Sequence, residues 1–195
     1  MATQGKSITL LLGGARSGKS RFAQQLASGW SKVTFIATAQ PIDDEMRLRI
    51  ERHRQDRPAS WSTVEVPVEL DAAIDQHGAI SEILVVDCLA LYAANIMALE
   101  HDHEEKIQAR VDRLCQALRS SVASVVLVSN EVGSGVVPAY PSGRFFRDLL
   151  GRINQQVAQI ADNVLLMVAG IPLAIKGSAE AEFSLQTTQK KQSAI

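Results

Sequence analysis

An apolar run at residues 8–12 leads directly into an octapeptide that reads Gly13-Gly14-Ala15-Arg16-Ser17-Gly18-Lys19-Ser20. This is the pattern G-x-x-x-x-G-K-S, and it stands between a predicted strand and the amphipathic stretch 22–27, which predicts a helix. The glycines let the backbone curl so that N–H groups point at phosphate oxygens, and the helix N-terminus adds its positive dipole. Lys19 supplies a charge for the β- and γ-phosphates, and Ser20 supplies a hydroxyl for Mg²⁺. The octapeptide therefore predicts a site for a nucleoside triphosphate, but no particular reaction.

Short apolar runs alternate with helical patterns along the rest of the chain. The further runs, each continuous in its apolar character, are residues 33–37, 83–86, 125–128 and 164–168. Helices are predicted at residues 43–55, 89–99, 104–121 and 143–160. Continuous apolar strands are covered on both faces, and their alternation with helices indicates parallel pairing with right-handed crossovers. We therefore expect an α/β fold, P-loop NTPase-like, with a mostly parallel sheet and helices on both faces.

The length and composition limit the class of protein. A chain of 195 residues suits one domain, and we expect a single P-loop α/β domain over residues 1–176 with a polar, mobile tail over 177–195. The formal net charge of −1 argues against a nucleic-acid partner, which requires a basic excess. The first apolar run is too short for a signal segment or a membrane span, and the two isolated cysteines indicate a reducing compartment. We therefore expect a cytoplasmic protein.

Several polar residues directly follow predicted strands. They are Ala37-Thr38-Ala39, Asp87 and Asn130-Glu131. Since ligands of parallel sheets bind beyond the carboxyl ends of the strands, we expect these segments and the octapeptide to gather at one edge. Asp87 has two compatible interpretations: it helps to hold Mg²⁺, or it caps the helix that begins near Cys88.

The most unusual segment is residues 43–57, where acidic residues come first and five arginines follow within residues 47–57. The helix dipole favours this order, so a solvated charged helix is one interpretation. However, Met46, Ile50 and His53 fall at i, i+4 and i+7, which places His53 on the apolar stripe. An inward imidazole surrounded by guanidinium groups is typical of a polyphosphate site. His53 is therefore either a packed histidine or a catalytic one.

Two other segments are less specific. The glycine-rich stretch 129–138 joins a strand to a helix, and it predicts either a nucleotide-responsive loop or a plain connection. His101 and His103 lie in an acidic stretch that indicates an exposed loop rather than a metal site.

Taken together, these segments resemble one family over residues 8–176, in consistent order and spacing. The matching residues are the octapeptide with Arg21, Ala37-Thr38, Asp43-Asp44-Glu45-Met46 through Ile50, His53 with Arg57-Pro58, Asp87-Cys88-Leu89, Ser129-Asn130-Glu131-Val132-Gly133, Phe146-Arg147-Asp148, and Gly151-Arg152 with Asn154-Gln155. The chain is similar to the bifunctional adenosylcobinamide kinase / adenosylcobinamide-phosphate guanylyltransferases of cobalamin biosynthesis.

The resemblance implies two reactions. A nucleoside triphosphate, GTP or ATP, phosphorylates the aminopropanol hydroxyl of adenosylcobinamide, and GTP then transfers GMP to that phosphate, giving adenosylcobinamide-GDP and pyrophosphate. By resemblance, His53 carries the guanylyl group and Gly13 to Ser20 form the phosphate loop, with Lys19 catalytic. The further nucleotide contacts implied are Ala37, Thr38, Ala39, Arg54, Gln55, Asp56, Arg57, Glu65 and Asp87. Ser20 and Asp87 are the candidate ligands of Mg²⁺, and relatives are homo-oligomers, usually trimers.

The chemistry of these residues agrees with that assignment. Attack by a neutral imidazole on the α-phosphorus would displace pyrophosphate and leave a reactive phosphoramidate. A carboxylate such as Glu65 accepts hydrogen bonds from the N1–H and amino group of guanine, a donor pair that adenine lacks. Two alternatives stay open: a small-molecule kinase without guanylyl transfer, and a nucleotide-gated switch protein in which residues 130–138 respond to the nucleotide.

Overall fold

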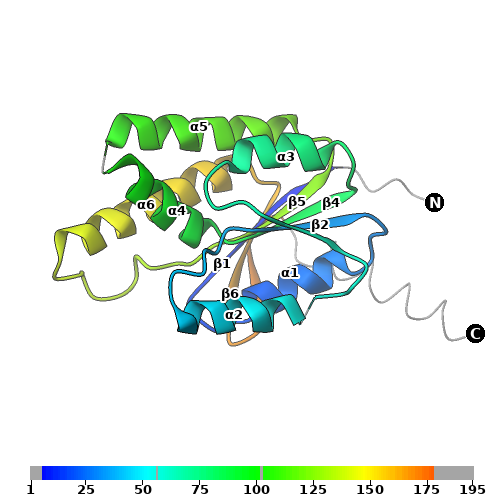
Figure 1. The fold of residues 1–195 in the computed structure, drawn as a ribbon, viewed down its shortest axis with the longest axis horizontal. Coiled ribbons are helices and arrows are strands. Elements are labelled where there is room, and N and C mark those ends of the chain that lie inside the picture. Colours follow the sequence, from blue (N-terminus) through cyan, green and yellow to red (C-terminus); the bar gives the residue numbers. More distant parts are fainter. Residues whose placement is uncertain (1–5, 56, 102, 178–195) are drawn as a thin grey trace, which may run out of the picture.

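A computed structural model describes residues 6–55, 57–101 and 103–177 (Figure 1). Residues 178–195, which make up nearly all of the expected tail, lie outside the described residues. The strands are β1 (Ile8–Gly13), β2 (Val33–Ala37), β3 (Ser62–Glu65), β4 (Ile83–Asp87), β5 (Ser124–Val128), β6 (Asn163–Val168) and β7 (Ile171–Lys176). The helices are α1 (Lys19–Ala27), α2 (Asp44–Gln55), α3 (Leu70–Gly78), α4 (Leu89–Glu100), α5 (Glu104–Ser120) and α6 (Pro141–Ile160).

The strands form a seven-stranded sheet in the order β3-β2-β4-β5-β1-β6-β7. All neighbouring pairs are parallel except β6 and β7, which are antiparallel. The expected α/β class with a mostly parallel sheet is therefore confirmed. β1 lies between β5 and β6, so the loop that follows β1 opens in the middle of the carboxyl edge.

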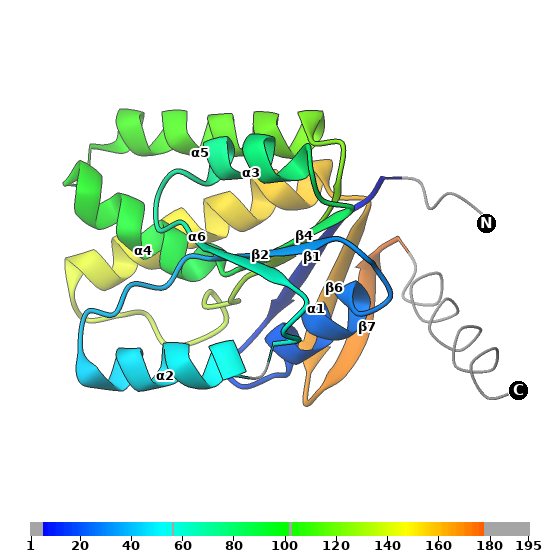
Figure 2. The same cartoon turned by 45° about the vertical axis from the view of Figure 1, so that its right-hand side comes forward.

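Helices cover both faces of the sheet, as the continuous apolar strands predicted. Leu10 of β1 faces the larger core, which the sheet forms with α3, α4, α5 and α6. Leu11, the next residue, faces the smaller core formed with α1, where it packs with Phe22. Figures 1 and 2 show α3 to α6 as a layer on one side and α1 with α2 on the other. Among the described residues, no helix combines the length and apolar character needed to span a bilayer.

Two strands were not predicted, and both lie at the edges of the sheet. β3 is a polar strand of four residues without an apolar run, and its residues are mostly exposed. β7 contains Pro172 and joins β6 through Ala169 and Gly170, both with positive φ (52° and 83°). Two positive φ angles in a two-residue connection are typical of a tight β-hairpin, since this turn matches the twist of the strands.

Candidate functional site

A cavity of about 800 Å³ opens at the carboxyl edge of the sheet. It receives residues from the phosphate loop, from the ends of β2 to β5, and from α2, α4 and α6. The predicted site residues that line it are Ala15, Arg16, Ser17, Gly18, Lys19, Ser20, Ala37, Ala39, His53, Arg57, Glu65 and Asp87. Asn130 also lines it, whereas its neighbour Glu131 does not. The segments expected at one edge of the sheet therefore do meet there.

The phosphate loop leads from β1 into α1, as the sequence predicted. The Lys19 side chain is buried and its Nζ donates to the carbonyl oxygens of Gly13 (2.9 Å) and Gly14 (2.6 Å). Burial lowers the pKa of Lys19, while the nearby Cys88 and Asp87 raise it in part. Gly13 and Gly14 thus hold the lysine rather than line the cavity.

Two glycines of this loop are required by geometry. A Cβ on Gly13 would lie 2.6 Å from the carbonyl oxygen of Met167 in β6, closer than any normal contact. Gly18 has a φ of 95°, and a Cβ there would lie 3.2 Å from Cα of Gly170. The Gly170 N–H in turn donates to the Ser17 carbonyl at 3.0 Å. The hairpin between β6 and β7 therefore supports the phosphate loop from behind.

Helix α2 presents the predicted stripe to the cavity. Met46, Ile50 and His53 all line it, and His53 is half-buried. The predicted set of surrounding arginines is met only in part: Arg52 and Arg57 line the cavity, whereas Arg47 pairs with Asp44 at 3.3 Å. The Arg49 side chain lies outside what the structure describes.

Arg57 follows α2 and stacks on an aromatic ring. Its guanidinium carbon lies 3.7 Å from the centroid of Phe35, a cation–π arrangement. Its Nε is buried and has no hydrogen-bond partner among the described residues. Burial lowers the pKa of Arg57, and Asp87 opposes that shift, but a guanidinium stays charged. A buried donor without a partner is the kind of group that an anionic ligand would satisfy.

Three further predicted nucleotide contacts, Thr38, Arg54 and Gln55, do not line the cavity. Thr38 is fully buried, and its hydroxyl donates to the Cys88 carbonyl and accepts from the Cys88 N–H, both at 2.8 Å. Thr38 therefore joins the ends of β2 and β4 and does not reach the cavity. Arg54 and Gln55 are exposed and do not line it either, and Asp56 lies outside the described residues.

Asp87 ends β4 and lines the cavity together with Ser20. The capping alternative for Asp87 is wrong, because the N-cap of α4 is Cys88. Within the described part of the chain, no three His, Cys, Asp or Glu side chains cluster as a metal site. One carboxylate and one hydroxyl beside a phosphate loop nevertheless fit Mg²⁺, which commonly takes one or two carboxylates, water and substrate phosphates.

Sequence reasoning missed one wall of the cavity. This wall consists of apolar residues of α4 and α6: Ala90, Leu91, Ala94 and Phe146. The first three follow Asp87 at the start of a helix, which places them at the carboxyl edge of the sheet. Apolar side chains give no sign of a ligand in a single sequence, so the position after a strand was the available signal.

A mostly parallel sheet with a phosphate loop after an interior strand defines a P-loop nucleotide-binding protein of the α/β class. A solved structure described as a prototypical ATPase from the type III secretion system of pathogenic bacteria shares the fold, with a TM-score of 0.55 and 11% identity. The match covers 92% of this chain and 61% of that ATPase, so this chain spans less than two thirds of its length.

Residues 9–175 match the family described as cobinamide kinase / cobinamide phosphate guanyltransferase, and the chain belongs to this family. The bifunctional adenosylcobalamin biosynthesis protein CobU of Escherichia coli K12 is 43% identical over 180 residues, which cover 87% of this chain and 99% of that protein. The CobP protein of Pseudomonas aeruginosa, described in the same words, is 41% identical, with 86% and 96% covered. The family resemblance seen in the sequence is therefore confirmed.

Proposed function

We propose that this protein phosphorylates the aminopropanol hydroxyl of adenosylcobinamide and then transfers GMP from GTP to the new phosphate, using His53 as the guanylyl carrier. The observation that supports this most is that His53 and the phosphate loop line the same cavity. A triphosphate bound at Lys19 then lies in the cavity that also contains the imidazole. The two alternatives, a kinase without guanylyl transfer and a nucleotide switch, assign no chemistry to His53.

The guanylyl transfer takes two steps. A lone pair of one His53 ring nitrogen forms a bond to the α-phosphorus of GTP, and the bond from that phosphorus to the bridging oxygen breaks, which releases pyrophosphate. A phosphate oxygen of adenosylcobinamide phosphate then attacks the same phosphorus. The N–P bond breaks, its electron pair returns to the ring, and neutral imidazole is restored. Adenosylcobinamide-GDP is the product.

The kinase step uses the other end of a triphosphate. The acceptor hydroxyl oxygen bonds to the γ-phosphorus, the bond from that phosphorus to the β–γ bridging oxygen breaks, the nucleoside diphosphate leaves, and the hydroxyl proton passes to solvent. Two basic residues of the cavity assist both reactions by positioning and by charge: Lys19 at the phosphate loop and Arg57 through its free Nε neutralise phosphate oxygens. Ser20 and Asp87 would hold Mg²⁺, which when bound neutralises the charge on the leaving phosphates.

The experiment that tests this function is labelling with GTP that carries the label on its α-phosphate, in the presence of Mg²⁺. We expect acid-labile label on the wild-type protein, a mass increase of one GMP on the peptide that contains His53, and no label on His53→Ala. His103→Ala is the matched control, because His103 is exposed and makes no capping bond with its side chain. That variant is expected to retain the label.

The other outcomes identify the alternatives. Label that persists in His53→Ala would remove His53 from the mechanism. Transfer of the γ-phosphate to cobinamide without protein-bound GMP would indicate a kinase alone, and nucleotide binding without either product would indicate a switch protein. From the family resemblance we also propose a homo-oligomer, a trimer, which light scattering on the purified protein would measure.

A further inference from the structure

The cavity has two walls of different chemistry. The polar wall holds the phosphate loop, Arg57, Glu65 and Asp87. The apolar wall consists of the residues of α4 and α6 already described, Ala90, Leu91, Ala94 and Phe146, together with Met46, Leu48 and Ile50 of α2. The nucleotide contacts that the family resemblance implies lie on the polar wall or beside it, at Ala37 and Ala39, and none of them belongs to the apolar wall. The apolar wall is therefore left without a ligand.

Apolar side chains continue from this wall to the surface. Leu48 lines the cavity and is still 54% exposed, and Ile42, in the segment before α2, is 76% exposed. The loop between β5 and α6 adds Val136 (95%), Val137 (58%) and Tyr140 (77%). In Figures 1 and 2 this loop runs between the layer of α4 with α6 and the helix α2. Asn130 at the start of this loop lines the cavity, so the exposed apolar residues belong to segments that adjoin it, and such segments are typical of a ligand or partner site.

We propose that the apolar wall binds the acceptor: it receives the aminopropanol arm of cobinamide, and the macrocycle rests on the exposed apolar residues outside. This assignment rests on the proposed function. A cavity of about 800 Å³ is of the size that encloses one small ligand, so it does not enclose a nucleotide and a whole corrinoid together. Only the arm that carries the reacting oxygen needs to enter.

One position of the arm serves both reactions. The reacting oxygen must reach the γ-phosphate beside Lys19 in the kinase step and the phosphorus on His53 in the guanylyl step. Asp87 belongs to the polar wall, and α4 begins two residues after it. Met46 and Ile50 share the stripe of α2 that carries His53. The apolar wall therefore adjoins both reacting groups, and the acceptor has no need to change sites.

Small side chains on α4 leave the space for this arm. Ala94 lines the cavity, and a leucine there would add three carbon atoms to the space. Leucine is a good helix former, so Ala94→Leu is expected to fold. Ala98→Leu makes the same change one turn later on α4, where the residue is exposed and does not line the cavity. It is the matched control.

The test compares two measurements on the purified full-length protein. For Ala94→Leu we expect the KM for cobinamide in the kinase step and the KM for cobinamide phosphate in the guanylyl step to rise together, each by about tenfold or more. Labelling of the protein by GTP is expected to persist, since that half-reaction uses no acceptor. Ala98→Leu is expected to match the wild type in all three measurements.

Other results of these measurements would contradict either the acceptor site or the proposed function. Unchanged KM values in an Ala94→Leu protein that is still labelled would show that the acceptor does not bind at this wall. A rise in only one of the two KM values would show that the acceptor does not occupy the same position in both reactions. A wild type that is never labelled would refute the proposed function instead. If Ala94→Leu does not fold, Phe146→Ala replaces it, because loss of the ring should raise the same two KM values while labelling persists.

Discussion

Arg54 donates a hydrogen bond of 2.6 Å to Glu65, and this ion pair joins the last turn of α2 to the end of β3. Both side chains are more than half exposed, 61% and 52%, so the pair contributes little to stability, about 0–1 kcal/mol. Its importance is positional. Glu65 lines the cavity while Arg54 does not, so the exposed arginine orients the carboxylate that we propose to read the guanine base.

Replacing Glu65 should therefore change which nucleotide is used. In Glu65→Gln the side chain keeps one acceptor oxygen and gains an amide donor that faces the donors of guanine. We expect the preference for GTP over ATP in protein labelling to fall by about tenfold or more. Competition between the two nucleotides at equal concentration measures this. Glu105→Gln, on the exposed side of α5, is the control, and an unchanged preference in Glu65→Gln would assign base recognition to another group.

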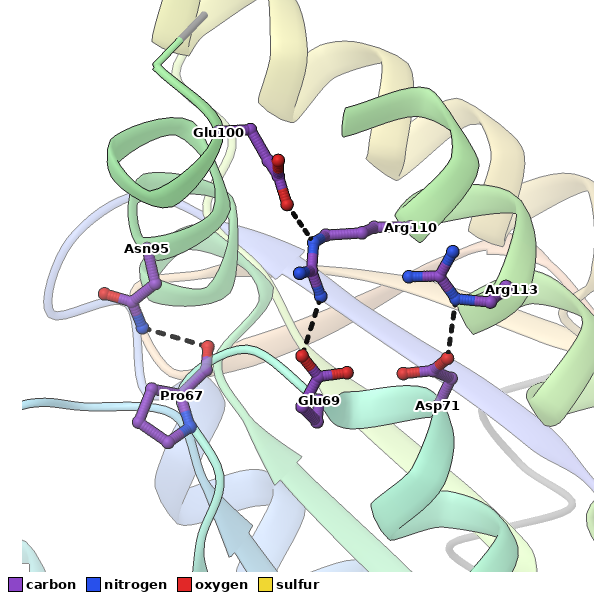
Figure 3. Close-up of polar contacts among 7 residues, drawn as sticks. All are labelled: Pro67, Glu69, Asp71, Asn95, Glu100, Arg110 and Arg113. Carbon is purple, nitrogen blue, oxygen red and sulfur yellow. Dashed lines mark hydrogen bonds and ion pairs between the residues drawn. The ribbon is translucent and has the colours of Figure 1, made fainter. Parts of the chain in front are cut away.

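Asn95 of α4 holds two segments of the site in place. Its side-chain amide donates to the carbonyl oxygens of Thr38 (2.8 Å) and Pro67 (3.0 Å), and Figure 3 shows it turned towards Pro67. Asn95→Leu leaves both acceptors without this donor, which should lower the free energy of unfolding by about 1–3 kcal/mol. Asn95→Asp should be worse, because a carboxylate would face two carbonyl oxygens. Urea unfolding ranks the three proteins, and an Asp variant as stable as wild type would contradict this role.

A second polar contact in Figure 3 makes stability depend on pH. Arg110 of α5 bonds Glu100 at 2.7 Å and Glu69 at 3.0 Å. The bond from Arg110 lowers the pKa of Glu100 below its ordinary value of 4.5. A carboxyl group whose pKa is lower in the folded state stabilises the fold above its ordinary pKa, and this stabilisation is lost as the pH falls through the lowered pKa.

Arg110→Met should therefore have a lower Tm than the wild type near neutral pH, and the difference should shrink as the pH falls from 4.5 through the lowered pKa of Glu100. Thermal unfolding followed by circular dichroism at a series of pH values measures this. Arg119→Met, an exposed change on the same helix, provides the comparison. A Tm difference that is constant with pH would mean that Arg110 acts by packing alone.

Cys88 lies in the cavity, and its thiol should react slowly. Burial raises the pKa of Cys88 to about 11, and the Asp87 carboxylate adds to the effect. Below pH 9, a shift of this size reduces the thiolate about a hundredfold relative to an ordinary thiol. Alkylation of Cys88 by iodoacetamide in a Cys115→Ala background should be correspondingly slow, rise steeply above pH 9, and slow further when GTP fills the cavity. Rapid alkylation near neutral pH would contradict the raised pKa of the thiol.

The central strands could be predicted because they are continuous apolar runs buried on both faces, as residues 83–86 illustrate. β3 could not, since Ser62 and Thr63 are exposed at an edge where pairing needs no apolar pattern. β7 was missed for a related reason, although Ala169-Gly170 offered a turn signal. The phosphate loop and the His53 stripe depend on local spacing, so both could be predicted from the sequence, and residues 15–20 and His53 line one cavity.

The position of other site residues depends on contacts between distant segments. Thr38 follows a strand, as Ala37 and Ala39 do, yet its side chain turns inward because the Cys88 backbone offers it two hydrogen bonds. The Arg54 side chain likewise pairs with Glu65 in the next strand and stays exposed. Neither partner could be identified from one sequence, because both contacts join separate elements.

The hairpin behind the phosphate loop has a consequence for biosynthesis of the protein. Ser17, near the start of the chain, receives its hydrogen bond from Gly170, near the end of the described part. Domains fold as units once their segments have been synthesised. A nascent chain that has emerged only as far as β5 already contains the whole octapeptide but lacks its rear support. The growing polypeptide therefore gains its full affinity for triphosphate only after the last strand pair has left the ribosome.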